Sequence, residues 1–231
     1  MLDLHQVDER PQPRNTNPST QLIMEARFYD YADLIINNIE GGYYNPARHN
    51  TNGMGSSGET MFGMDRKNGG SLFDTAIGQQ FWRIIDANSA TWPWNYFGGA
   101  QESKLRTLAA EIMGQSYEKY SGLYLTDEAR KIISKSPRLE THFYYACWNG
   151  PGYFQNFAKS INAAIQGGKR KTADLENIAI QDRLTHSVAL IRKGGEKMRD
   201  KIWPQLPGSG GGIWLWLILG AATIYFLTKK S

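Results

Sequence analysis

The fold is decided first at residues 21–44, which read QLIMEARFYDYADLIINNIEGGYY. Apolar side chains recur there at spacings of three and four, a pattern that places them on one face of a helix. These residues are Leu22, Ala26, Tyr29, Ala32, Ile36 and Ile39. We therefore predict a helix from Gln21 to Glu40, which the pair Gly41 and Gly42 ends.

The chain beyond this helix predicts a mostly helical domain with one small β-lobe. Residues 41–70 hold eight glycines together with many Asn, Ser and Thr residues, so we expect loops and short hairpins there. Ser71 and Asp74 resemble a helix cap and open the second predicted helix. The remaining predicted helices are Ser71–Asn88, one around Leu105–Ile112, Thr126–Lys135, Arg138–Trp148, Gly152–Ile165 and Ala173–Arg192. The predicted fold class is mainly α, with the β-lobe making it α+β.

The two ends of the chain differ from this folded domain, which we place at residues 21–203. Residues 1–20 are polar and hold three prolines, so they are predicted to form a flexible arm. Residues 204–212 are rich in proline, glycine and serine and predict a linker. Residues 213–228 carry no charge, and as a helix they would cover about 24 Å of a hydrocarbon core of about 30 Å. Tryptophans near their start and Tyr225 with two lysines at their end are typical of a transmembrane helix.

Composition excludes several kinds of site. The only cysteine, Cys147, cannot form an intrachain disulfide, and its aromatic neighbours predict a core position. The four histidines show no ligand spacing, so no metal and no cofactor are expected, and a metal-dependent amidase or peptidase is not favoured. The net charge of +4 does not demand a nucleic acid, which is not expected as a partner.

Glu40 is the main candidate for chemistry. Cleavage of a glycosidic bond needs a carboxylic acid that stays protonated near neutral pH, so that it can donate its proton to the leaving oxygen. Glu40 follows the apolar Ile39 and precedes two glycines, so it can project from an apolar wall while leaving room for a polymer chain. Burial of this kind raises the pKa of a carboxyl group. We therefore predict that Glu40 is a general acid.

Two motifs resemble a known enzyme family. The first is Glu40-Gly41-Gly42-Tyr43 followed by Gly58-Glu59-Thr60, with Gly63 and Met64 behind it. The second is the run from His142 to Gly152, HFYYACWNGPG. In this order the motifs are similar to those of glycoside hydrolase family 108, lysozyme-like muramidases that are frequent in phages.

The resemblance covers roughly residues 34–190 and carries several implications. It implies a lysozyme-like fold, a peptidoglycan glycan substrate, a catalytic glutamate at Glu40 and no metal. The family commonly has an acidic-Pro-Gly-Gly run before its Glu-Thr, whereas this chain has Met54-Gly55-Ser56-Ser57-Gly58, which bears on the geometry of Glu59. The C-terminal anchor is similar to that of virion-associated lytic enzymes of membrane-containing phages.

The sequence does not decide which polar residues act together with Glu40. Glu59 is a candidate second catalytic residue, and it could instead orient water or hold the β-lobe by bonding backbone amides. Asp65, also a candidate substrate-binding residue, competes with Glu59 for the role of second carboxylate, although a local ion pair with Arg66 is the simpler interpretation. Thr60 could orient water or a sugar hydroxyl, or it could make a packing or turn contact. Asn149 is a candidate substrate-binding residue, and it could instead cap or brace the floor of the site.

Aromatic side chains supply candidate sugar-binding faces. The run Trp92–Phe97, with Trp94 in it, and the pair Tyr43 and Tyr44 could stack on the sugar rings of a glycan. Aromatic residues at this density can equally fill a core.

The sequence therefore predicts a glycosidase that cleaves the β-1,4 bond between N-acetylmuramic acid and N-acetylglucosamine, for phage entry or host lysis. Hydrolysis and lytic transglycosylation both remain open. The alternative is a non-enzymatic virion membrane protein that uses a lysozyme-like domain as a structural or wall-binding module. The expected partners are peptidoglycan glycan strands, a lipid membrane and other virion proteins. The expected location is the virion membrane and the host cell envelope, with the C-terminal helix as anchor.

Overall fold

The computed structural model describes residues 18–49, 58–67, 69 and 72–207, with side chains from residue 26 onward. This part of the chain holds eight α-helices and one two-stranded antiparallel sheet, which confirms the mainly helical prediction. The helices are α1 Pro18–Asn38, α2 Ala76–Asn88, α3 Glu102–Tyr124, α4 Asp127–Ile133, α5 Pro137–Asn149, α6 Pro151–Gln166, α7 Thr172–Leu184 and α8 Ala189–Lys197. The strands are β1 Thr60–Met61 and β2 Met64–Asp65.

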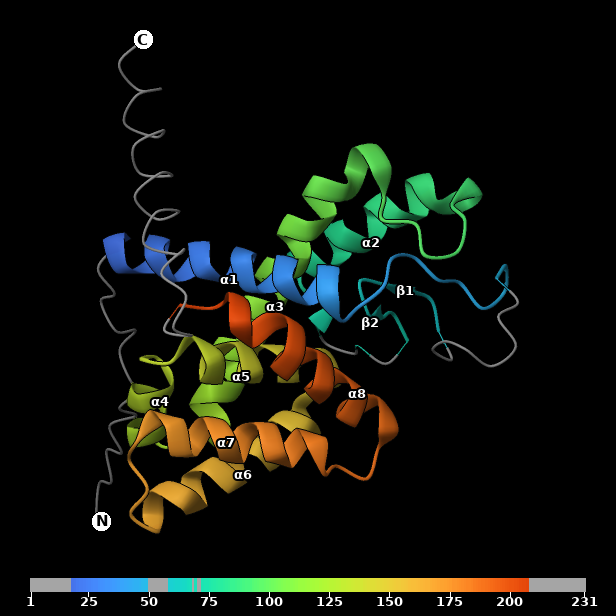
Figure 1. Ribbon diagram of the computed structural model, residues 1–231. Coiled ribbons are helices and arrows are strands. Elements are labelled where there is room, and N and C mark those ends of the chain that lie inside the picture. The colour runs from blue at the N-terminus through green and yellow to red at the C-terminus, as the bar shows by residue number, and fades with distance from the viewer. Residues whose placement is uncertain (1–17, 50–57, 68, 70–71, 208–231) are drawn as a thin grey trace, which may run out of the picture.

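Helix α1 separates two groups of elements (Figure 1). Helix α2 and the β1–β2 hairpin lie near the C-terminal end of α1, and α4 to α8 gather on the other side. Helix α3 packs along α1, and α5 runs through the interior, where Phe143, Tyr144 and Ala146 are wholly buried. The C-terminal end of α1 therefore lies where the two groups of elements meet.

The hairpin forms the predicted β-lobe. Thr60 pairs with Asp65 and Met61 with Met64, so Phe62 and Gly63 make the two-residue turn. Both turn residues have positive φ values, 53° and 74°, as in the tight turns that match the twist of a hairpin. An isolated bridge between Tyr44 and Thr60 ties this lobe to the segment that follows α1.

Two predicted helix ends differ from the structure. Helix α1 ends at Asn38, so Glu40 follows the helix instead of closing it. Helix α2 begins at Ala76, because the hydroxyl of Thr75 accepts the N–H of Gly78 at 3.1 Å and caps the helix there. The predicted cap by Ser71 and Asp74 is therefore wrong.

The long helix predicted at Ala173–Arg192 is also wrong, since the chain breaks there into α7 and α8. The break is held by side chains: His186 Nδ1 accepts the N–H of Val188 at 3.1 Å, and Arg192 donates to the carbonyl oxygen of His186 at 2.6 Å. A Cβ on Gly194 would lie 2.7 Å from the hydroxyl of Tyr145. The break thus lets α8 fold back against α7 and brings Gly194 next to Tyr145 of α5, contacts that local periodicity does not encode.

Two further predictions concern burial and the membrane. Cys147 is 1% exposed, which confirms its core position. Among the residues that the structure describes, no helix is both long enough and apolar enough to cross a bilayer. The predicted transmembrane helix at residues 213–228 and the arm up to residue 17 lie outside the described residues.

Candidate active site

Glu40 sits directly against the turn of the hairpin. Its backbone N–H still donates to the carbonyl oxygen of Ile35 at 3.1 Å, which fixes the direction in which the chain leaves α1. The residue as a whole is partly exposed. A Cβ on Gly63 would lie only 2.0 Å from the Glu40 carboxylate oxygen Oε2 and 2.5 Å from Cδ. Glycine at position 63 therefore serves two needs, the positive φ of the turn and the space for this carboxyl group.

The turn is held from the helical side of the molecule. Trp148 of α5 donates its indole N–H to the carbonyl oxygen of Phe62 at 2.7 Å. The guanidinium of Arg106 lies over the rings of Phe62 and Phe97, at 5.4 Å and 5.8 Å from their centres. These contacts fix the backbone on which the Glu40 carboxyl group rests.

The surroundings of Glu40 favour its protonated form. Burial raises the pKa of this carboxyl group to about 7, against the lowering effects of a hydrogen bond with Tyr145 and of the positive charges of Lys197 and Arg183. Near neutral pH a large fraction of the molecules therefore carries the proton. A carboxylic acid with this pKa can donate a proton to a bound substrate.

A buried network supports Tyr145 and, through it, Glu40. The Tyr145 hydroxyl hydrogen-bonds with Glu40 and with Asn149. Arg183, which is 0% exposed, donates to Asn149 Oδ1 at 3.0 Å and lies 4.5 Å from the centre of the Tyr145 ring. Its Nε also donates to His142 Nδ1 at 3.2 Å. Asn149 thus braces the site from beneath, one of the roles considered from sequence.

Lys197, at the end of α8, contacts the chain next to Glu40. Its ammonium group donates to the carbonyl oxygen of Ile39 at 2.9 Å, and its charge acts on the neighbouring Glu40. Sequence reasoning missed Lys197, Arg183 and Tyr145. Tyr145 and Asn149 were within reach of a sequence signal, because they stand four residues apart in one motif and so share a helix face.

Glu59 lies at the other end of the hairpin. Its Oε1 accepts from the Tyr43 hydroxyl at 2.5 Å and from Asn45 at 3.3 Å, while its Oε2 accepts from Arg66 at 3.0 Å. Glu59 precedes β1 and Gly63 lies in the turn, so at most about 13 Å of chain separates them. The geometry favours the lobe-holding role for Glu59 over direct catalysis, although its partners are side chains instead of the backbone amides that we expected.

The ion pairs of Arg66 also differ from the sequence prediction. Its ion pairs are with Glu59 and with Asp86 of α2, at 3.0 Å and 2.6 Å, and not with the neighbouring Asp65. Asp65 accepts the backbone N–H of Lys67 at 2.8 Å. Arg66 therefore ties the hairpin to α2, because its long side chain reaches two carboxylates that the fold brings together. The predicted local ion pair is wrong.

Of the candidate sugar-binding aromatic residues, Tyr43 lies in the core and Trp94 lies at the surface. Tyr43 is 0% exposed, so its ring cannot stack on a sugar as predicted; instead it packs edge-on against the largely buried Trp92. Trp94 is 59% exposed and stays available for a glycan. The backbone of Thr60 pairs with Tyr44, with N···O distances of 2.8 Å and 2.9 Å in the two directions.

Comparison with protein-family models, with curated proteins and with solved structures finds no match to this chain. Within the described part of the chain, no three or more His, Cys, Asp or Glu residues are grouped so that they could hold a metal ion.

Proposed function

We propose that this chain cleaves the β-1,4 bond between N-acetylmuramic acid and N-acetylglucosamine in peptidoglycan, with Glu40 as the general acid. The observation that carries the proposal is the carboxyl group of Glu40, a partly exposed residue, whose pKa is raised to about 7 at the turn of a small β-lobe. A glycosidase acid requires such a raised pKa. The two motifs similar to lysozyme-like muramidases add the substrate class.

The reaction uses Glu40 twice. It first gives its proton to the glycosidic oxygen, the bond from that oxygen to the anomeric carbon breaks, and positive charge develops on the sugar ring. The resulting carboxylate then accepts a proton from the group that attacks the anomeric carbon. That group is water in hydrolysis and the 6-hydroxyl of the muramic acid in lytic transglycosylation.

The residues around Glu40 favour lytic transglycosylation over hydrolysis. The groups that act on its pKa are Tyr145, Lys197 and Arg183, and none of them is a carboxylate. Glu59, the nearest candidate by sequence, is held by Tyr43, Asn45 and Arg66. One glutamate that acts first as acid and then as base fits this arrangement, and so we propose lytic transglycosylation as the reaction.

Product analysis tests the proposal directly. The purified full chain is incubated with isolated peptidoglycan at pH 6, and the soluble products are analysed by mass spectrometry. We expect disaccharide-peptides that end in 1,6-anhydromuramic acid. Reducing muramic acid ends would replace transglycosylation with hydrolysis, and the absence of any soluble product between pH 5 and 8 would contradict the enzymatic assignment.

The hydroxyl of Tyr145 is expected to set the pH range of activity. Its hydrogen bond lowers the pKa of Glu40, so Tyr145→Phe should raise that pKa and move the alkaline limb of the kcat/KM profile up by about 0.5–1 pH unit. Tyr144→Phe is the matched control, because the Tyr144 hydroxyl donates to the Ala110 carbonyl oxygen at 3.0 Å instead. A downward shift, or equal shifts in both variants, would contradict the role of Tyr145.

Glu59→Gln separates support of the lobe from catalysis. We expect kcat to fall less than tenfold and the free energy of unfolding to fall by about 1–2 kcal/mol, since charge-assisted bonds from Tyr43 and Arg66 are weakened. Rate measurements and denaturant unfolding give the two values. A loss of rate equal to that of Glu40→Gln with unchanged stability would instead make Glu59 a second catalytic carboxylate.

We also propose membrane anchoring through residues 213–228, which supports a location in a virion membrane and then in the host envelope. The support is their uncharged composition and the terminal tryptophan and lysine residues. The full chain should float with lipid vesicles in a density gradient, and a chain that ends at residue 207 should not. Equal flotation of both would contradict the anchor.

A further inference from the structure

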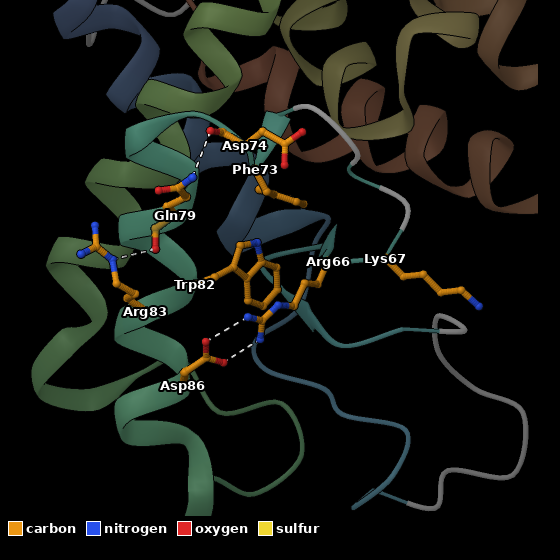
Figure 2. A pocket seen from close by; sticks show the side chains of 8 residues that line it. All are labelled: Arg66, Lys67, Phe73, Asp74, Gln79, Trp82, Arg83 and Asp86. Carbon is orange, nitrogen blue, oxygen red and sulfur yellow. Dashed lines mark hydrogen bonds and ion pairs between the residues drawn. The ribbon is translucent and has the colours of Figure 1, made fainter.

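A cavity of about 700 Å³ lies between α2 and the chain that leaves β2 (Figure 2). It is separate from the contacts of Glu40: Arg66 and Lys67 line it from the hairpin side, and Phe73, Trp82 and Arg83 line it from the α2 side. A cavity of this size can hold several residues of a peptide or a drug-sized ligand.

The wall of the cavity is aromatic and fixed. The rings of Phe73 and Trp82 meet edge to face, with centres 5.3 Å apart. The guanidinium of Arg66 lies 4.9 Å from the centre of the Trp82 ring and is held there by Asp86 (Figure 2). The indole N–H of Trp82 has no hydrogen-bond partner among the described residues, although Trp82 is only 4% exposed. The wall thus offers an aromatic surface beside a guanidinium group.

The charges around the cavity are of both signs. Lys67 and Arg83 stand on opposite sides of the indole in Figure 2, and neither has a carboxylate partner in the described part of the chain. The carboxylate of Asp74, also on the lining, makes no ion pair there. Arg66 is already held between Glu59 and Asp86, so the lining groups without an ion pair among the described residues are the cations Lys67 and Arg83 and the anion Asp74.

The cavity and Glu40 share the hairpin. Gly63 touches the Glu40 carboxyl group, and Arg66 follows three residues later, a step of about 10 Å along the chain. An extended peptide of three to five residues covers about 10–17 Å. A substituent on a sugar bound at Glu40 can therefore reach the cavity.

We propose that this cavity binds the stem peptide of the glycan strand that Glu40 cleaves, an inference that rests on the proposed function. The carboxylates of the peptide would meet Lys67 and Arg83, its amino group would meet Asp74, and an apolar side chain would lie on Trp82. Two cations with one anion match a zwitterionic peptide that carries more carboxylates than amines.

The test compares two substrates and two matched variants. Wild type, Lys67→Ala/Arg83→Ala and Lys159→Ala/Lys169→Ala are assayed on intact peptidoglycan and on the same glycan after an amidase has removed the peptides. Lys159 and Lys169 are exposed residues in and after α6, so the control removes the same charge elsewhere. We expect the first variant to raise KM about tenfold on intact peptidoglycan only, with wild-type kcat, and the control to behave as wild type.

A binding measurement separates this inference from the proposed function. The wild-type full chain is titrated with N-acetylmuramyl-tripeptide and with N-acetylmuramic acid alone, without any turnover. Tighter binding of the tripeptide form, lost in Lys67→Ala/Arg83→Ala, would support the cavity even if neither substrate were cleaved. Equal binding of both ligands, or equal KM changes on both substrates, would overturn the inference.

Discussion

Glu40→Gln is expected to slow the cleavage of peptidoglycan by about 10³-fold, because glutamine keeps the shape of the side chain but has no acidic proton to give. The variant should still bind glycan, since Lys197, Tyr145 and the hairpin turn keep their places around position 40. Clearing of a cell-wall gel gives a first comparison, and release of soluble fragments at pH 6 gives the rate. Equal clearing by both proteins would favour the non-enzymatic wall-binding alternative.

Glu140→Gln is the matched control for this experiment. Burial raises the pKa of Glu140 to about 7 as well, but its carboxylate is enclosed by Arg27 at 2.9 Å and by the hydroxyl of Tyr31 at 3.1 Å. Glu140 is 2% exposed and so cannot reach a polymer. Activity per folded molecule should stay near that of wild type, which would show that a raised pKa alone does not make the catalytic acid.

The raised pKa of Glu40 also predicts how stability depends on pH. The folded state holds the proton up to a pKa of about 7, whereas the ordinary value is 4.5. The contribution of this group is therefore complete below pH 4.5 and is lost as the pH rises through 7. At pH 8 Glu40→Gln should be more stable than wild type by on the order of 1–2 kcal/mol, after allowance for the partial exposure of Glu40. Urea unfolding at pH 5 and pH 8 checks the sign, and a constant difference between the two proteins would contradict it.

Gly63→Ala should have the second largest effect on activity, a loss of about 10²-fold from misplacement of the acid. The new methyl group would lie 2.0 Å from Oε2 of Glu40, so the carboxyl group or the turn must move. The turn is tied to α5 by the hydrogen bond from the Trp148 indole to the Phe62 carbonyl oxygen. We therefore expect the carboxyl group of Glu40 to move instead of the turn. Steady-state rates on peptidoglycan measure the loss.

Gly168→Ala separates this steric effect from backbone strain. Gly168 has a φ of 92°, yet an added Cβ there would meet nothing within 4 Å. Both substitutions place alanine at positive φ, which costs about 1–2 kcal/mol, but only Gly63→Ala displaces Glu40. Gly168→Ala should thus lose stability and keep its activity. Equal activity in the two variants would contradict the contact between Gly63 and Glu40.

Much of the local structure follows from the sequence alone. The apolar spacing before Ile39 predicts α1, and Pro137 with the Asn-Gly-Pro turn after Trp148 separates the helices around the second motif. These signals are local, because helix periodicity, caps and breakers act within a few residues. The same local pattern places the carboxyl group of Glu40 at the end of an apolar segment. It could not anticipate the break between α7 and α8, where His186 and Arg192 satisfy the backbone with their side chains.

Sequence by itself determined the mainly helical class and the glycine-rich lobe, and it singled out Glu40 as the candidate acid. Tertiary structure alone decided the surroundings of that acid. Tyr145, Arg183 and Lys197 come from three different helices, and Arg66 pairs with the distant Asp86 in place of its neighbour Asp65. The physical reason is that a pKa and an ion pair depend on exclusion of water and on distances in space. Only the packing of elements that are remote in the chain sets those quantities.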